Sequence, residues 1–161
     1  MSESVVSFFG VIAYLGSWQL IVPGGVFLLA GMYAQDLVLQ AKTLFYTLVA
    51  SELFVLIVKI LMNKPRPGNA LVTPEDPWSF PSAHSSVVFV LYGLLAFFVW
   101  QRPDVALGWK IATLVVAVVI ATLVCASRVV LHVHDLTDVI GGAVIGIVFL
   151  VLGIWYFFSF S

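Results

Sequence analysis

The sequence predicts an all-α integral membrane protein: a helical bundle of about five transmembrane helices, preceded by an interfacial N-terminal helix. Of the 161 residues, 62% are hydrophobic and only 9% are charged, whereas a soluble domain carries about 25% charged residues. Apolar residues form runs of about 20, the length that crosses a ~30 Å hydrocarbon layer. Five Trp, five Tyr and 13 Phe accompany these runs, so the chain is expected to fold mostly in lipid.

The N-terminal region predicts a short helix followed by a weak span. Residues 3–16 mix serines with apolar side chains. About a dozen residues cannot cross a bilayer at 1.5 Å each, so we expect an amphipathic helix in the interface, with Trp18 at headgroup depth. The alternative is a sixth span over 5–22. No basic leader precedes this region, which we interpret as mature chain. The next run, 20–35, contains a Pro-Gly-Gly sequence and is expected to be short or kinked.

Four longer runs predict the remaining spans. They cover 42–62, 83–100, 109–128 and 136–158, and the connectors are 36–41, 63–82, 101–108 and 129–135. Because crossings alternate, 63–82 and 129–135 lie on one face of the membrane and the other two connectors on the opposite face. A chain of this length is expected to form a single membrane-embedded domain, residues 1–161.

Charge and cysteine content exclude some partners. The net charge of −1 gives no reason to expect nucleic acid. Cys125 is the single cysteine, so an intrachain disulfide is impossible. The oligomeric state has no signature in the sequence.

The charged and imidazole side chains gather near two connectors on one face. They are Lys59, Lys64, Arg66, His84, Arg128, His132, His134, Asp135 and Asp138. Charges at apolar depth are costly and by default mark function. A lone cation at a helix end more often reaches to the headgroups. A cluster of this size needs an anion, and phosphate is the natural candidate because Arg donates to two of its oxygens at once.

The connector 63–82 leads into the span 83–100. It carries five prolines and is therefore expected to be stiff and non-helical. Pro81-Ser82 predicts the start of the following helix. Ser82 is either a simple N-cap or, with the following amides, a ligand for an oxyanion. The two interpretations are compatible.

His134 and Asp138 stand four residues apart, which predicts one shared helix face. A carboxylate that accepts from one imidazole nitrogen fixes the tautomer and leaves the other nitrogen free to attack. A metal site is the alternative, because His132 and Asp135 add two further ligand types. The surrounding cations would repel a divalent ion.

These residues resemble the three signatures of the type 2 phosphatidic acid phosphatase superfamily, in its membrane-embedded lipid phosphatase branch. The matches are Lys59 to Arg66-Pro67, then Pro81-Ser82-Ala83-His84, then Ser127-Arg128 through His134 to Asp138. Ala83 replaces the usual Gly of the second signature. The family usually has six spans, and this chain is expected to lack the first.

The resemblance implies a role for each matching residue. His134 would be the nucleophile that forms a phosphohistidine, Asp138 would orient it, and His84 would protonate the leaving oxygen and then activate water. The phosphate-binding residues would be Lys59, Arg66, Ser82, the amides near Ala83, and Arg128. No metal or other cofactor is implied. Ser127 matches the signature but is expected either to pack or to bond the backbone, while His132 and Asp135 match nothing and could line the entrance.

The expected activity is hydrolysis of a lipid phosphomonoester or diphosphate. Undecaprenyl diphosphate, phosphatidylglycerol phosphate and phosphatidic acid all suit the cluster. The alternatives are a lipid phosphotransferase and a non-catalytic transporter or proton-relay protein; the absence of an internal repeat disfavours the transporter. When the cations implied in the site are left out of the count, one membrane face keeps three basic residues, Lys42, Arg102 and Lys110, and the other keeps Lys64 alone. The positive-inside rule therefore puts the site on the extracytoplasmic face of the cell membrane.

Overall fold

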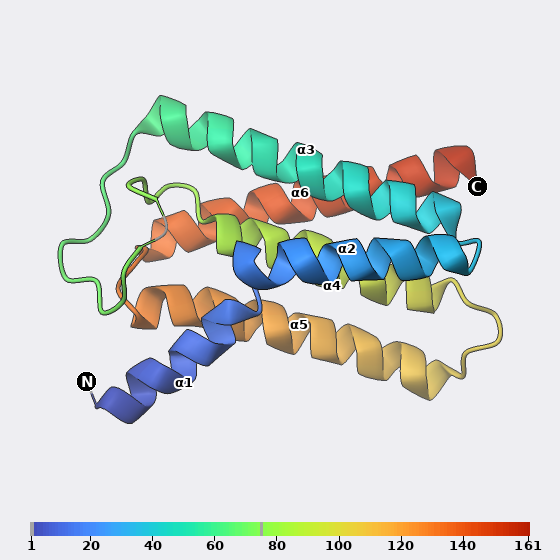
Figure 1. Ribbon diagram of the computed structural model, residues 1–161, viewed down its shortest axis with the longest axis horizontal. Coiled ribbons are helices and arrows are strands. Elements are labelled where there is room, and N and C mark those ends of the chain that lie inside the picture. The colour runs from blue at the N-terminus through green and yellow to red at the C-terminus, as the bar shows by residue number, and fades with distance from the viewer. Residues whose placement is uncertain (1, 75) are drawn as a thin grey trace.

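The computed structural model describes residues 2–74 and 76–161, and over these residues it contains helices and no named strand. The helices are α1 (Glu3–Tyr14), α2 (Trp18–Ala34), α3 (Val38–Met62), α4 (Ala83–Trp100), α5 (Leu107–Val130) and α6 (Leu136–Phe160). Helices α2 to α6 run alongside one another, and the long connector between α3 and α4 lies at the same end of the bundle as the short connector between α5 and α6 (Figure 1).

Within the described residues, five stretches are long and apolar enough to cross a membrane, with α1 and α2 counted together as the first of them. The predicted fold class, a multi-pass helical membrane protein, is therefore confirmed. The observed helices extend several predicted spans: α3 begins at Val38 and α5 covers Leu107–Val130. Helices continue past the apolar run because backbone hydrogen bonding persists into the headgroup layer, where charged side chains find water.

The N-terminal region is divided as expected. α1 diverges from the bundle at an angle and is separated from α2 by a turn over residues 15–17 (Figure 1). Gly16 sits in that turn, where a Cβ atom would press on Val88, Val124 and the carbonyl oxygen of His84. The interfacial position of α1 stays a prediction. α2 continues through Pro23 and, at 17 residues, is shorter than the helices that follow it.

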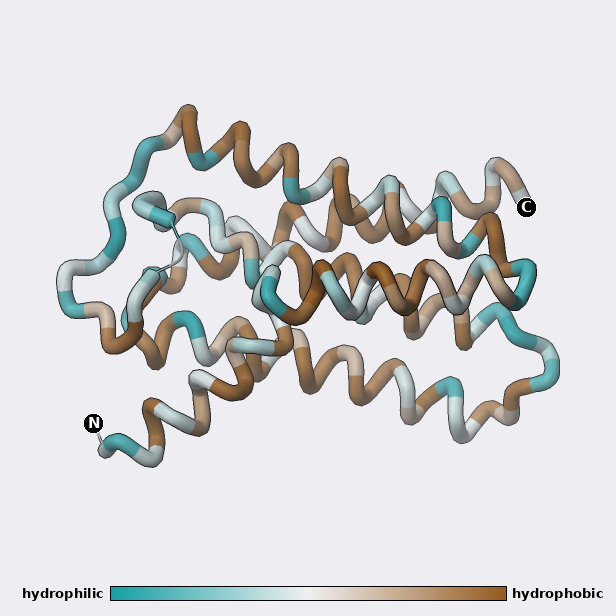
Figure 2. The backbone as a smooth tube through the Cα atoms, viewed as in Figure 1, coloured by the Kyte–Doolittle hydropathy of each residue, from teal (hydrophilic) through white to brown (hydrophobic). Residues whose placement is uncertain are grey.

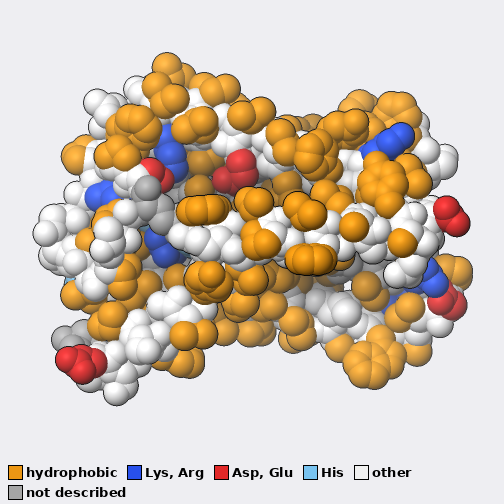
Figure 3. Space-filling view, in the orientation of Figure 1, with side chains coloured by type: hydrophobic (Ala, Val, Ile, Leu, Met, Phe, Trp, Pro, Cys, Tyr) orange, Lys and Arg blue, Asp and Glu red, His pale blue; other side chains and the backbone are white. Residues whose placement is uncertain are grey.

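α4 is the central helix, packed against α3, α5 and α6. Val88, Val90 and Leu94 of α4 are fully buried and meet Leu44 of α3 and Val124 of α5. The hydrophilic residues lie mostly at the two ends of the bundle, and the helices between them are largely hydrophobic (Figure 2). Hydrophobic side chains also cover much of the visible outer surface (Figure 3), as expected where lipid replaces water as the solvent.

Candidate active site

The two connectors that carry the predicted site residues meet at the same end of the bundle (Figure 1). The backbone amide of Leu71 donates to the carbonyl of Leu131 at 3.0 Å, which joins the connector after α3 to the one after α5. Within the first connector, the amide of Ser79 donates to the carbonyl of Lys64 at 2.9 Å. These backbone bonds, rather than a regular helix or sheet, hold the proline-rich chain over the ends of α4 and α6.

His134 lies between two charged partners and is 3% exposed. Its Nε2 is 3.1 Å from Nη1 of Arg66. Because a guanidinium group can only donate, Nε2 is the accepting nitrogen and the proton resides on Nδ1. Nδ1 faces Oδ2 of Asp138 at 3.7 Å, so the nitrogen with the lone pair points toward the cations.

Burial, followed by the nearby charges of Arg66, Arg128 and Lys59, lowers the pKa of His134 to about 2. A buried imidazole surrounded by cations resists protonation, since the imidazolium would be desolvated and repelled. At neutral pH the ring is therefore neutral. Neutrality is the state that a nucleophilic nitrogen requires.

Asp138 lies beside His134, but the two residues do not share a helix face, and this part of the prediction was wrong. α6 begins at Leu136, so His134 precedes the helix while Asp138 lies in its first turn. The amide of Asp135 donates to Oδ2 of Asp138 at 2.9 Å, in a capping box. The cap brings the Asp138 carboxylate back toward the residue before the helix. The spacing thus placed the pair in contact, but helical periodicity was the wrong reason.

Lys64 holds the other oxygen of the same carboxylate. Its Nζ is 2.6 Å from Oδ1 of Asp138, which is fully buried, and 3.0 Å from Oδ2 of the exposed Asp135. Burial lowers the pKa of Lys64, but the hydrogen bonds to these two carboxylates outweigh it and raise the pKa above its usual value. Lys64 therefore stays cationic and neutralises a charge that would otherwise be buried alone.

Arg66 and Lys59 converge on one carboxylate, that of Asp76. Nη2 of Arg66 is 3.1 Å from Oδ1 of Asp76, and Nζ of Lys59 is 3.3 Å from Oδ2. Arg66 also donates to the Asp76 carbonyl at 2.6 Å and to the Val133 carbonyl at 2.9 Å, and Lys59 to the Trp78 carbonyl at 2.9 Å. Both cations are buried, and the carboxylate oxygens between them occupy a position suited to any anion.

The N-terminus of α4 supplies Ser82, Ala83 and His84. Ser82 is the N-cap, fully buried, and its hydroxyl accepts from the amide of Ser85 at 3.4 Å. The Ser82 amide donates to the carbonyl of Asp138 at 3.0 Å, which fixes α4 against α6. Ala83 is the first residue of α4, so its methyl group is accommodated by helical backbone.

His84 and Arg128 complete the cluster from two different helices. His84 is 6% exposed and lies close enough to Arg128, His134, Arg66 and Lys59 for all four to act on it electrostatically. Arg128 lies in the last turn of α5 and is 5% exposed. Residues from α3, α4, α5 and both connectors thus meet at one point.

Ser127 and His132, which had no clear expected role, each form a hydrogen bond. The hydroxyl of Ser127 donates to the carbonyl of Val124 at 2.6 Å, which is a backbone contact within α5. His132 is exposed, has a φ of 56° and shares a 3.0 Å hydrogen bond with Asn69. Among the described residues, no group of three His, Cys, Asp or Glu side chains is arranged to hold a metal ion.

Three charged residues of structural importance were not identified as site residues from the sequence. Lys64 was one cation among several, Asp76 was one acid of the proline-rich connector, and Glu52 was part of an apolar span. Glu52 did carry a signal, since a carboxyl group inside a span is expensive. The pairings of Lys64 with Asp138 and of Asp76 with Lys59 and Arg66 depend on how the connectors fold, and no spacing rule predicts them.

Comparison with known proteins gives consistent matches. Residues 40–161 match the model of the PAP2 superfamily. The chain is 32% identical over 144 residues to phosphatidylglycerophosphatase B of Bacillus subtilis, covering 88% of this chain and 71% of that protein. A PA-phosphatase related-family protein of Dictyostelium discoideum is 34% identical over 135 residues, which cover 75% of this chain and 49% of that protein.

Solved structures match over nearly the whole chain. A transmembrane PAP2 type phosphatidylglycerolphosphate phosphatase from Bacillus subtilis superimposes with a TM-score of 0.91 at 27% identity, covering 100% of this chain and 80% of that chain. LpxE of Aquifex aeolicus gives a TM-score of 0.74 at 26% identity, covering 97% and 88%.

Proposed function

Because this chain belongs to the PAP2 superfamily and its relatives are membrane phosphatases, we propose that it hydrolyses a lipid phosphate through a phosphohistidine intermediate. The observation that carries this proposal is the convergence of Arg66, His84 and His134, which come from three separate parts of the chain. Phosphoryl transfer depends mainly on positioning and on charge stabilisation. A neutral imidazole surrounded by buried cations provides both.

The proposed reaction has two steps. Nε2 of His134 attacks phosphorus, the bond from phosphorus to the leaving oxygen breaks, and His84 gives that oxygen a proton. The lipid alcohol, or the lipid monophosphate from a diphosphate, then departs. In the second step His84 takes a proton from water, the resulting hydroxide attacks phosphorus, and the bond to Nε2 breaks to release inorganic phosphate. Asp138 stabilises the positive charge on the imidazole through Nδ1.

The phosphate oxygens would be held by Lys59, Arg66, Arg128, Ser82 and the amide of Ala83. Asp76 supports this assignment, because its carboxylate already bridges Lys59 and Arg66. The three cations would supply the charge neutralisation that a divalent ion supplies in other phosphotransfer enzymes. We therefore propose a reaction that needs no metal.

The relatives' names favour one substrate class. Both the Bacillus subtilis relative and the matched Bacillus subtilis structure are named for phosphatidylglycerol phosphate. We propose a phosphomonoester of this type as the first substrate to test, ahead of phosphatidic acid and undecaprenyl diphosphate. The apolar helices around the site would keep the acyl chains in lipid while the phosphate enters between the helix ends.

The test is phosphate release from a panel of these three lipids by the protein purified in detergent, with EDTA present. We expect turnover, inhibition by vanadate, and loss of at least a thousandfold in kcat for His134→Ala. His132→Ala is the matched control, because it removes an exposed imidazole two residues away. Full activity of His134→Ala, or activity that requires added metal, would reject the proposed mechanism.

A further inference from the structure

Glu52 is a carboxyl group within the membrane-spanning part of α3. It stands seven residues before Lys59, which is about 10.5 Å along the helix axis. Its side chain lies close enough to Ser86 of α4 for the hydroxyl to act on it electrostatically. One of its oxygens, Oε1, is buried and has no hydrogen-bond partner in the described part of the chain. A buried acceptor without a donor is costly, and the proposed mechanism makes no use of this one.

Glu52 lies at one end of a cavity of about 390 Å³ between α2, α3 and α4. The remaining wall is almost entirely apolar and includes Ile21, Leu28, Leu48 and Leu91. The hydroxyl of Tyr92, which also lines the cavity, donates to the carbonyl of Leu15 at 3.0 Å. The cavity suits a hydrocarbon chain, with one hydrogen-bond acceptor at a defined end.

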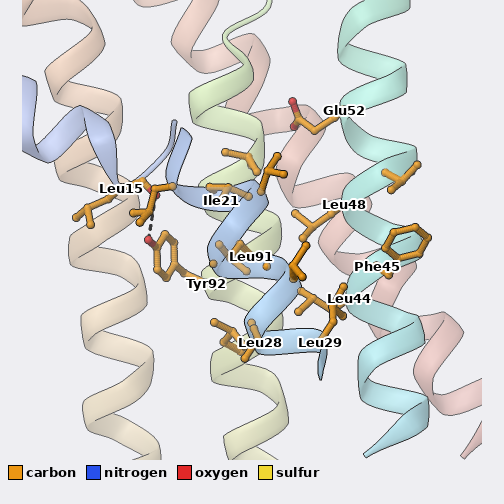
Figure 4. A pocket seen from close by; sticks show the side chains of 18 residues that line it. Leu15, Ile21, Leu28, Leu29, Leu44, Phe45, Leu48, Glu52, Leu91 and Tyr92 are labelled. Atoms are coloured by element: carbon orange, nitrogen blue, oxygen red, sulfur yellow. Dashed lines mark hydrogen bonds between the residues drawn. The ribbon is translucent and has the colours of Figure 1, made fainter. Parts of the chain in front are cut away.

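That end is the one nearest the active site. Figure 4 shows Glu52 at the end of the cavity that lies nearer the N-terminus of α4. Ser86, which lies close to Glu52, follows His84 by two residues, about 3 Å along the helix. Lys59 is close enough to act electrostatically on Glu52. A lipid with its phosphorus beside His84 and its chain in the cavity would therefore pass Glu52 within its first few atoms.

We propose that Glu52 is a specificity-determining residue that accepts a hydrogen bond from a hydroxyl or amino group next to the phosphoester carbon of the lipid. This inference rests on the proposed phosphatase function. In either protonation state a carboxyl group keeps an accepting oxygen, so the interaction is available to any such donor. A substrate without the donor leaves Oε1 buried and unpaired. Sites built to bind a polar group discriminate against analogues that lack it for this reason.

The occupant of the cavity is the hydrocarbon chain of the substrate itself. The apolar wall matches it, and the cavity ends at Glu52, which stands seven residues before Lys59 on α3. A hydrogen bond to a carboxylate typically changes an equilibrium by about 10- to 100-fold, which sets the size of the expected preference.

The experiment compares two lipids that differ in one hydroxyl group: 1-oleoyl-glycerol 3-phosphate and its 2-deoxy analogue. For the wild-type protein we expect kcat/KM to be about 10- to 100-fold higher for the hydroxyl lipid. In Glu52→Leu this ratio should fall to nearly one. Glu52→Gln keeps an accepting oxygen and should retain most of the ratio. Leu53→Ala, an exposed neighbour that does not line the cavity, is the control and should keep the wild-type ratio.

The outcomes separate the proposed role of Glu52 from the proposed phosphatase function. If the wild-type protein hydrolyses both lipids with the same kcat/KM, the proposed role of Glu52 is overturned while the phosphatase function stands. The same holds if the kcat/KM ratio of the two lipids is unchanged in Glu52→Leu. A purely structural role predicts equal losses for both lipids and a lower melting temperature, which also overturns it. If Glu52→Leu does not fold, the ratio in the wild-type protein and in Glu52→Gln still decides. Failure of the wild-type protein to release phosphate from either lipid rejects the phosphatase function as well.

Discussion

At the scale of single residues, the candidate site contains two carboxylates that each lie between two nitrogen-bearing side chains. Asp138 contacts His134 on one side and Lys64 on the other, and Asp76 bridges Lys59 and Arg66. Each arrangement places a negative charge where the proposed reaction would need it: behind the proposed nucleophile in one case, and in the proposed position of the phosphate in the other. Both can be tested by removing one charge.

Asp76→Asn removes the carboxylate that lies between two buried cations. An incoming anion would then no longer compete with it, so we expect vanadate to inhibit about 10-fold more strongly than in the wild-type protein. Inhibition constants measured at fixed substrate concentration test this. Weaker inhibition would mean that Asp76 positions the cations instead of competing for them. Asp104→Asn is a control, because Asp104 is exposed and pairs with Arg102 on the opposite connector.

Lys64→Met removes the cation that faces Asp138 away from His134. The carboxylate charge that Lys64 neutralised would then act on the imidazole, so the pKa of His134 should rise above about 2, although burial and the other three cations still hold it low. Protonation would inactivate His134 as the proposed nucleophile. The acid limb of kcat/KM should therefore move to higher pH. Lys64→Arg keeps the charge and should retain the wild-type profile; an unshifted profile in Lys64→Met would contradict this role.

The sequence identifies the residues of the three signatures because charged groups in an apolar chain are rare. Lys59, Arg66, His84 and His134 could be found in this way. Asp76 could not, because its importance depends on a fold of the proline-rich connector that has no periodicity. The capping box at Asp135 is a further example, since His134 lies two residues before the start of α6 and the cap, rather than a shared helix face, explains its contact with Asp138.

At the scale of elements, the site depends on the contact between α4 and α6. Gly142 and Gly146 of α6 lie against the carbonyl oxygens of Ser82 and Ser86, so closely that a Cβ atom at either glycine would overlap them. Small residues permit this approach of two membrane helices. Because Ser82 is the N-cap of α4, the spacing of the two helices directly sets where His84 stands relative to Asp138.

Gly142→Ala should separate α4 from α6. Backbone atoms at Ser82 cannot move aside without moving the cap, so we expect a clear drop in melting temperature and at least a 10-fold loss of kcat. Thermal unfolding in detergent and phosphate release measure both. Gly31→Ala in α2 is the matched control, since nothing lies within 4 Å of the added methyl group; it should be neutral or slightly stabilising. Normal activity in Gly142→Ala would show that the two helices adapt.

The helices themselves are largely predictable, because an apolar run of the right length has few alternatives in lipid. α4 begins at the residue where Pro81-Ser82 predicts it, and α2 continues where Pro23 suggests a break. The proline lies in the second turn of α2, near the end where few backbone bonds are lost. Local sequence therefore locates the helices. The effect of the glycines that bring α4 and α6 together depends on the neighbouring helix, which local sequence does not reveal.

At the scale of the whole molecule, the basic residues divide into two sets at opposite ends of the bundle. The site end carries the paired cations described above, and the other end carries Lys42, Arg102 and Lys110. We propose that the second end faces the cytoplasm, because basic residues without a functional role are retained on that side. The site would then face outward.

The orientation can be measured by cysteine labelling in whole cells. In a Cys125→Ser background, Asn69→Cys at the site end and Gln101→Cys at the other end introduce single exposed thiols. We expect a membrane-impermeant maleimide to label Asn69→Cys in intact cells and Gln101→Cys only after permeabilisation. The reverse pattern would place the site in the cytoplasm.

The position of the cavity near the candidate site would give the two products of the proposed reaction separate exits. The polar connectors border water, whereas the space that ends at Glu52 lies among lipid-facing helices. Inorganic phosphate would diffuse away into a large aqueous volume, and the dephosphorylated lipid would be diluted laterally in the bilayer. The two products would thus leave through different exits into different phases. The dilution of each product in its own phase would keep their recombination rare, whereas the routes by which they leave would not change the equilibrium.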